Sequence, residues 1–279
     1  MYPVLLSLGP LHFYSFGTLL ILGIVLSWFL LRYLVFFYRL EISKFYYALP
    51  WVAVGSLLAA RLGMMFTYTE RFRSGLGAVI FPMHWWAEWA IWAGIGGAII
   101  GFVIYLLKHN EPVFLWLDVL SLTLQPLVFF VALGLFLSPV GLTAEALGKP
   151  TILPWGVMVD AVDLPFANVP VHPLLLYIVF VALLAFCSLW MMRGWARAYI
   201  GRLFVLTVAW YSVLWFLLSS VRWYTPHLFI GLDVLLLNAF LYAFIAGASF
   251  IYIVRKHTIT QKMKAEKNHS AHHVLKQGS

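Results

Sequence analysis

Residues 18–31 read TLLILGIVLSWFLL, an apolar run without a charged side chain. Strands of a membrane barrel alternate apolar and polar residues over about 10 positions, and this run shows no such alternation. A helix needs about 20 apolar residues to cross the ~30 Å hydrocarbon core of a bilayer. Because the apolar character extends over residues 13–37, with Arg32 as the one charged residue, the run predicts a transmembrane α-helix.

Six further apolar runs follow along the chain, at residues 45–68, 87–107, 114–137, 172–192, 200–221 and 229–254. Of the 279 residues, 63% are apolar and 10% are charged, whereas a soluble domain carries about 25% charged residues. The sequence therefore predicts an all-α, polytopic membrane protein with seven transmembrane helices. We expect one transmembrane domain over residues 1–258 and a polar, basic tail over residues 259–279.

Lysine and arginine residues indicate the orientation, because they accumulate in cytoplasmic loops. They follow the first, third and fifth runs and occupy the C-terminal tail, as Arg39, Lys44, Lys108, Arg193, Arg197, Arg202, Arg255 and Lys256. The long 138–171 segment on the opposite side carries more acidic than basic residues, although two arginines in the 69–86 loop depart from the pattern. The distribution predicts an N-terminus outside and a C-terminus inside.

The net charge of +8 is explained by the same asymmetry, so we expect no nucleic-acid partner. The partner that the charge favours is membrane lipid, since a basic segment is attracted to anionic headgroups. We interpret the three histidines of the 259–279 tail as part of a disordered basic segment rather than as a metal site.

Polar side chains in and beside the apolar runs gather toward the outer face. Arg61 lies about two-thirds of the way along the second run, and an Arg at the bilayer centre costs ~2.5–3.5 kcal/mol on the insertion scale. Two interpretations stay open: the guanidinium reaches the headgroups or a helix carbonyl, or it binds a lipid phosphate bidentately. The other residues expected on this face are His12, Tyr14, Glu145, Lys149, His172 and Arg222. Together they predict acid–base chemistry and phosphate binding near the non-cytoplasmic face.

Glycines give the third run a smooth face, at Gly94, Gly96, Gly97 and Gly101. Small residues let two helix backbones approach closely in a membrane. We therefore expect this helix to pack tightly against a neighbour.

Several segments resemble the phosphatidylglycerol–prolipoprotein diacylglyceryl transferases of bacterial inner membranes. The resemblance is spread over most of the chain, in SLGPLHFY at 7–14, ARLG at 60–63, LGKPT at 147–151, LPWGV at 153–157, His172-Pro173 with Tyr177, and Gly201 with Tyr211 and Arg222. Glu145 stands at the acidic position of the family's outer loop. The family's seven spans and outside N-terminus also match the topology predicted above.

The resemblance implies transfer of the diacylglyceryl group from phosphatidylglycerol to the lipobox cysteine thiol of a prolipoprotein signal peptide. It implies catalytic roles for His172, Tyr14, Tyr177 and Glu145, and phosphate binding by Arg61, Arg222 and Lys149. It implies no metal and no organic cofactor. The expected location is the bacterial inner membrane, crossed several times.

The chain departs from the family's pattern in the fourth, third and sixth spans. Ala132 and Leu135 stand where the fourth-span signature has an Arg and an Asn, and no Arg occurs between Arg73 and Arg193. The third-span His is replaced by glycine, and the sixth-span Arg and Glu fall on Trp215 and Ser219. Each change removes a group that stabilises a departing phosphate.

Two functions therefore remain open from the sequence. The first is an active diacylglyceryl transferase, and the second is an inactive descendant that binds lipid or lipoprotein as a membrane scaffold. A retinal protein is excluded because residues 229–254 contain no lysine for a Schiff base. A transporter lacks support, since no pair of broken helices or clear repeat is visible.

Overall fold

The structure is a computed structural model that describes residues 4–8, 11–67, 88–138, 148–158, 169–196, 200–223 and 239–253. The predicted tail, residues 259–279, lies outside the described residues, and so does Glu145.

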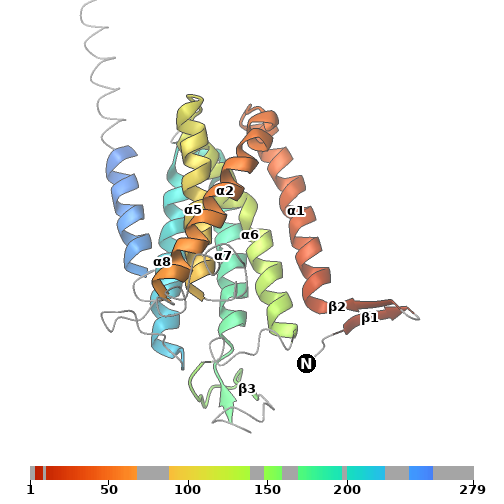
Figure 1. Cartoon of the computed structure of the whole chain (residues 1–279). Coiled ribbons are helices and arrows are strands. Elements are labelled where there is room, and N and C mark those ends of the chain that lie inside the picture. Colours follow the sequence, from red (N-terminus) through yellow and green to blue (C-terminus); the bar gives the residue numbers. More distant parts are fainter. Residues whose placement is uncertain are drawn as a thin grey trace, which may run out of the picture. The chain divides into compact units, whose positions relative to one another are not determined.

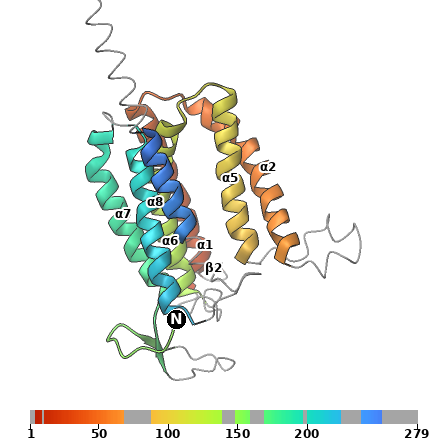
Figure 2. The same ribbon diagram turned by 90° about the vertical axis from the view of Figure 1, so that its left-hand side faces the viewer.

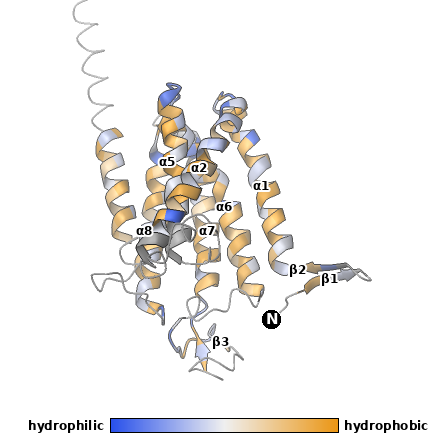
Figure 3. Ribbon diagram, viewed as in Figure 1, coloured by the Kyte–Doolittle hydropathy of each residue, from blue (hydrophilic) through white to orange (hydrophobic). Residues whose placement is uncertain are grey.

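Each predicted span overlaps an observed helix (Figure 1), although residues 229–238 of the last span lie outside the described residues. The helices are α1 (Ser15–Phe37), α2 (Ile42–Thr67), α5 (Glu88–Lys108), α6 (Val113–Leu137), α7 (Leu174–Ala196), α8 (Arg202–Val221) and a further helix, Ala239–Ile253. Apolar residues run along the length of these helices (Figure 3). The prediction of a helical membrane protein is confirmed.

Five of these helices are long and apolar enough to cross a membrane: Ser15–Phe37, Ile42–Gly63, Val113–Leu137, Leu174–Gly194 and Arg202–Val221. Within the described residues, the apolar helices Ala93–Lys108 and Ala239–Ile253 are shorter. The count of seven spans and the outside N-terminus remain predictions. Large apolar side chains such as Phe29, Leu58 and Phe244 are exposed on the helix surfaces, as expected of helices whose surroundings are lipid.

Two short antiparallel strand pairs stand outside the helices. β1 (Val4–Leu8) pairs with β2 (Leu11–Tyr14), and β3 (Val157–Met158) pairs with β4 (Pro170–Val171). The prediction that the first helix includes residues 13 and 14 is therefore wrong, because strand pairing satisfies the backbone of His12 and Tyr14. The Gly9-Pro10 dipeptide that separates the two strands in the sequence is a turn signal.

The chain forms two compact units, which are described separately: residues 1–34 with 117–279, and residues 35–116. In the second unit, α2 and α5 run side by side (Figure 2). A Cβ at Gly97 would collide with the backbone of Gly55, and one at Gly101 would collide with the carbonyl of Trp51. The prediction that the glycine-rich helix packs closely is confirmed. Near the loops, Lys44 Nζ and Glu111 Oε1 form an ion pair at 3.0 Å.

In the first unit, an acidic side chain of α6 caps the start of α8. The Asp118 side chain is fully buried, and it accepts hydrogen bonds from the N–H groups of Gly201 at 2.5 Å and Phe204 at 2.8 Å. The first amides of a helix have no partner within the helix. Gly201 takes a left-handed conformation with φ of 94° and provides no side-chain cap, so Asp118 supplies the missing acceptor from another helix.

Candidate functional site

The segment before α7 is held by backbone hydrogen bonds to the segment 148–151. Gly148 N–H donates to the carbonyl of His172 at 3.1 Å, and His172 N–H donates to the carbonyl of Lys149 at 3.1 Å. A Cβ at Gly148 would overlap the Cβ and carbonyl of His172. Glycine at this position therefore permits the close approach that places Lys149 beside His172.

The same segment is tied to the end of α8. Lys149 N–H donates to the carbonyl of Val221 at 2.7 Å, and its Nζ donates to the carbonyl of Ser220 at 2.8 Å. Gly148 also forms a β-bridge with Arg222, whose side chain is only 4% exposed. The backbone thus gathers three of the predicted site residues, His172, Lys149 and Arg222.

A chain of hydrogen bonds connects His172 to the first turn of α7. His172 Nδ1 lies 2.9 Å from Tyr177 Oη, and Trp155 Nε1–H donates to the same oxygen at 3.0 Å. Burial lowers the pKa of His172 below its ordinary value of 6.5, because a less solvated imidazole favours its neutral form. Burial therefore favours the neutral form of His172.

We call Trp155, His172, Tyr177, Lys149 and Arg222 the outer-loop cluster. It combines two cations, a neutral imidazole and a phenol at the ends of α7 and α8. Cations and hydrogen-bond donors of this kind stabilise negative charge that develops on a leaving group. The arrangement suits chemistry on a phosphate-bearing molecule.

Among the described contacts of the first unit, none brings Tyr14 into this cluster. Tyr14 ends β2 with 63% of its surface exposed, and among the described residues its side chain makes no hydrogen bond to the cluster. Arg61 is half-buried in α2, in the second unit. Glu145 lies outside the described residues, as noted above.

Sequence reasoning missed the polar pair in the middle of the first unit. Gln125 of α6 is buried, and it accepts a hydrogen bond from the hydroxyl of Tyr211 in α8 at 2.8 Å. The amide nitrogen of Gln125 donates to the carbonyl of Ser121 at 2.8 Å. The available signal was a glutamine within an apolar helix, which requires a partner in lipid. The sequence motif that contains Trp155 gives no signal for the hydrogen bond of its indole to Tyr177.

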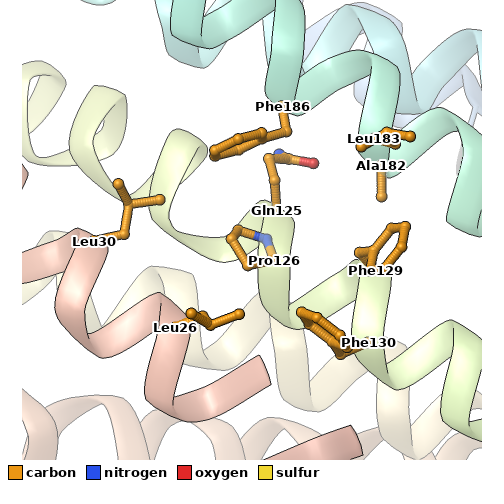
Figure 4. Close-up of a pocket in the computed structure, with 9 residues that line it drawn as sticks. All are labelled: Leu26, Leu30, Gln125, Pro126, Phe129, Phe130, Ala182, Leu183 and Phe186. Atoms are coloured by element: carbon orange, nitrogen blue, oxygen red, sulfur yellow. The ribbon is translucent and has the colours of Figure 1, made fainter. Parts of the chain in front are cut away.

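An apolar cavity of about 370 Å³ lies between α1, α6 and α7 (Figure 4). Its lining residues are Leu26, Leu30, Gln125, Pro126, Phe129, Phe130, Ala182, Leu183 and Phe186. At 1.5 Å per residue, Ala182 and Phe186 lie about 12–18 Å from the start of α7. The wall residues Leu26 and Leu183 are 42% and 46% exposed, so the cavity is open at the helix surface.

The comparisons with known proteins agree with one another. A family model described as prolipoprotein diacylglyceryl transferase matches residues 3–255. The chain is 30% identical over 233 residues to a phosphatidylglycerol–prolipoprotein diacylglyceryl transferase of Wolbachia sp. subsp. Drosophila simulans (strain wRi), covering 79% of this chain and 81% of that protein. It is 26% identical over 232 residues to the protein of the same name from Nitratidesulfovibrio vulgaris, covering 81% and 82%.

Proposed function

The chain belongs to the prolipoprotein diacylglyceryl transferase family, and on this premise we propose that it transfers the diacylglyceryl group of phosphatidylglycerol to the lipobox cysteine of a prolipoprotein. The resemblance predicted from the sequence motifs is confirmed by the family match over residues 3–255. The substrates named for the relatives are phosphatidylglycerol and a prolipoprotein, and we assign the same two classes to this chain.

The reaction makes a thioether. The thiol sulfur forms a bond to the terminal glyceryl carbon, and the bond from that carbon to the phosphate oxygen breaks. Glycerol phosphate leaves with the electron pair of that bond, and the thiol proton passes to a base. The protein therefore has to bind a phosphate, receive a proton and admit two substrates from the membrane.

The observation that carries this proposal is the backbone ladder that joins Lys149, His172 and Arg222. The ladder places two cations and an imidazole at the ends of α7 and α8. Arginine and lysine are the side chains that bind phosphate most strongly. We assign phosphate binding to Arg222, Lys149 and Arg61, and catalytic roles to His172, Tyr177, Tyr14 and Glu145.

The apolar cavity supports a substrate with long hydrocarbon chains. Its residues lie about 12–18 Å along α7 from the end that carries the outer-loop cluster. A diacyl lipid whose headgroup contacts the cluster would place the distal part of one acyl chain at this depth. The amide of Gln125 is already paired with Tyr211 and Ser121, so the cavity is suited to an apolar occupant.

We place the protein in the bacterial inner membrane as a multi-pass protein. Five helices are long and apolar enough to cross a bilayer, and the relatives are bacterial lipoprotein-modifying enzymes by name. Prolipoprotein signal peptides would then approach the outer-loop cluster from within the membrane plane.

Complementation tests the proposal against the inactive scaffold. The full chain is expressed in a strain whose own transferase has been depleted, and a model prolipoprotein is examined by mass spectrometry. An active enzyme adds one diacylglyceryl group to the lipobox cysteine and restores growth. Folded, membrane-inserted protein that leaves the thiol unmodified would rule out the transferase and leave the scaffold.

A further inference from the structure

The hydrogen bonds around Tyr177 determine which nitrogen of His172 carries the proton. The Tyr177 hydroxyl has two partners among the described residues, Trp155 at 3.0 Å and His172 at 2.9 Å. A tryptophan indole N–H is a donor only. The hydroxyl oxygen therefore accepts from Trp155, and its own hydrogen is free to be donated.

Two arrangements of the bond to His172 are then possible. If His172 Nδ1 carried the proton, the hydroxyl oxygen would accept from both Trp155 and His172. Its hydrogen would then have no acceptor in the described part of the chain and would have to turn toward solvent, since Tyr177 is only half-buried. If Nδ1 is unprotonated, the Tyr177 hydroxyl donates to it, and all three groups are satisfied. Hydrogen bonds that run in one direction also polarise and strengthen one another.

We propose that Trp155 is a positioning residue: it donates to Tyr177, directs the Tyr177 hydroxyl onto Nδ1 of His172 and leaves the imidazole proton on Nε2. His172 then presents a neutral N–H donor instead of a base. A donor of this kind gives a hydrogen bond to a phosphate oxygen and stabilises the negative charge that gathers there as the leaving group departs. This last role rests on the proposed function, whereas the position of the proton does not.

Among the described residues, the hydrogen bond that connects Trp155 to His172 runs through Tyr177. The Trp155 indole bonds to Tyr177, and Tyr177 bonds to His172, so its effect passes through two hydrogen bonds. Burial lowers the pKa of His172, and the neutral imidazole that it favours agrees with this arrangement. The thiol base must then be a group other than His172.

Nuclear magnetic resonance of the full chain in nanodiscs tests the position of the proton. Nitrogen shifts of isotope-labelled histidine distinguish the two tautomers, and the His172→Gln variant identifies the His172 signals by their loss. We expect a protonated Nε2 and an unprotonated Nδ1 in the unmodified protein. In Trp155→Phe, which keeps the ring but removes the N–H, a mixture of tautomers should appear.

Trp210→Phe is the matched control, since it removes an indole N–H from α8 without touching Tyr177. It should leave the His172 signals unchanged. A protonated Nδ1 in the unmodified protein, or an identical tautomer in Trp155→Phe, overturns the proposal. The readout does not require turnover, so it remains decisive if the chain transfers nothing.

Kinetics test the catalytic part. Trp155→Phe should lower kcat about tenfold, the effect of one hydrogen bond, with little change in KM for phosphatidylglycerol. A rise in KM with unchanged kcat would show that Trp155 affects lipid binding instead. The expected tautomer together with no transfer in any variant would contradict the proposed function and leave the positioning role intact.

Discussion

Asp118 of α6 accepts the backbone N–H groups of Gly201 and Phe204 at 2.5 and 2.8 Å, and so closes the N-terminus of α8 from a different helix. The Asp118 side chain is fully buried. A buried carboxylate at a helix N-terminus is stabilised both by charge-assisted hydrogen bonds and by the helix dipole. It therefore links the position of α6 to that of α8, whose far end carries Arg222.

Replacing Asp118 with Ala should destabilise the first unit by about 2–4 kcal/mol, because two buried N–H groups lose their acceptor. Asp118→Asn keeps one acceptor oxygen and should cost less. Thermal unfolding in detergent measures both. The control is Glu111→Gln, which breaks the partly exposed pair with Lys44 and should cost about 0–1 kcal/mol. Equal stability of all three variants would contradict the capping role.

Gly148→Ala should lower transfer strongly, since the added methyl would overlap the Cβ and carbonyl of His172. The ladder that places Lys149 beside His172 would then separate, while the helices stay folded. Turnover of a model prolipoprotein measures the loss of transfer, and the helical circular dichroism shows whether the helices stay folded. Gly17→Ala, where a Cβ has nothing within 4 Å, should behave like the unmodified chain. Full activity of Gly148→Ala would show that the ladder is dispensable.

Arg61→Ala should abolish transfer if its guanidinium binds the lipid phosphate, and Arg61→Lys should retain a fraction because lysine keeps the charge but not the bidentate geometry. Transfer kinetics with phosphatidylglycerol measure the loss. Arg32→Ala removes an exposed arginine from α1 and serves as the control. Unchanged turnover in Arg61→Ala would assign Arg61 to the alternative role at the headgroups.

Ala182→Leu should reduce the use of lipids with long acyl chains more than of lipids with short ones. Ala182 is a buried wall of the apolar cavity, and overpacking an apolar site costs ~1–3 kcal/mol, about tenfold in kcat/KM. The measurement is the ratio of kcat/KM for two lipid donors that differ only in acyl-chain length. Leu184→Phe enlarges an exposed neighbour on α7 and should leave the ratio unchanged. The same ratio in both variants would mean that the cavity holds no substrate chain.

The pH dependence of His172 follows from its environment. Burial lowers its pKa in the folded chain below 6.5, so the unfolded chain binds the proton more readily. The stability contributed by His172 is therefore present above pH 6.5 and is lost as the pH falls through the lowered pKa. We expect His172→Gln to remove this part of the acid destabilisation in thermal unfolding from pH 5 to 8. A His172 that titrates above 6.5 would contradict the effect of burial.

The sequence predicted the helices but not the contacts between polar residues, and the reason is physical. Helices fill most of the described part of every predicted span, because a long apolar run in lipid can satisfy its backbone only within itself. The first boundary was wrong at Tyr14, where strand pairing satisfies the same groups from a neighbouring segment. Hydropathy does not distinguish these two solutions over only a few residues.

The sequence by itself determined the apolar helices, the family and the set of polar residues that need partners in a lipid environment. Only the tertiary structure decided which of those residues meet: His172 with Tyr177 and Trp155, Lys149 with the end of α8, and Asp118 with the start of α8. Helix formation depends on residues close in the chain. These polar contacts join segments up to 86 positions apart, and they form only where packed helices bring donor and acceptor together.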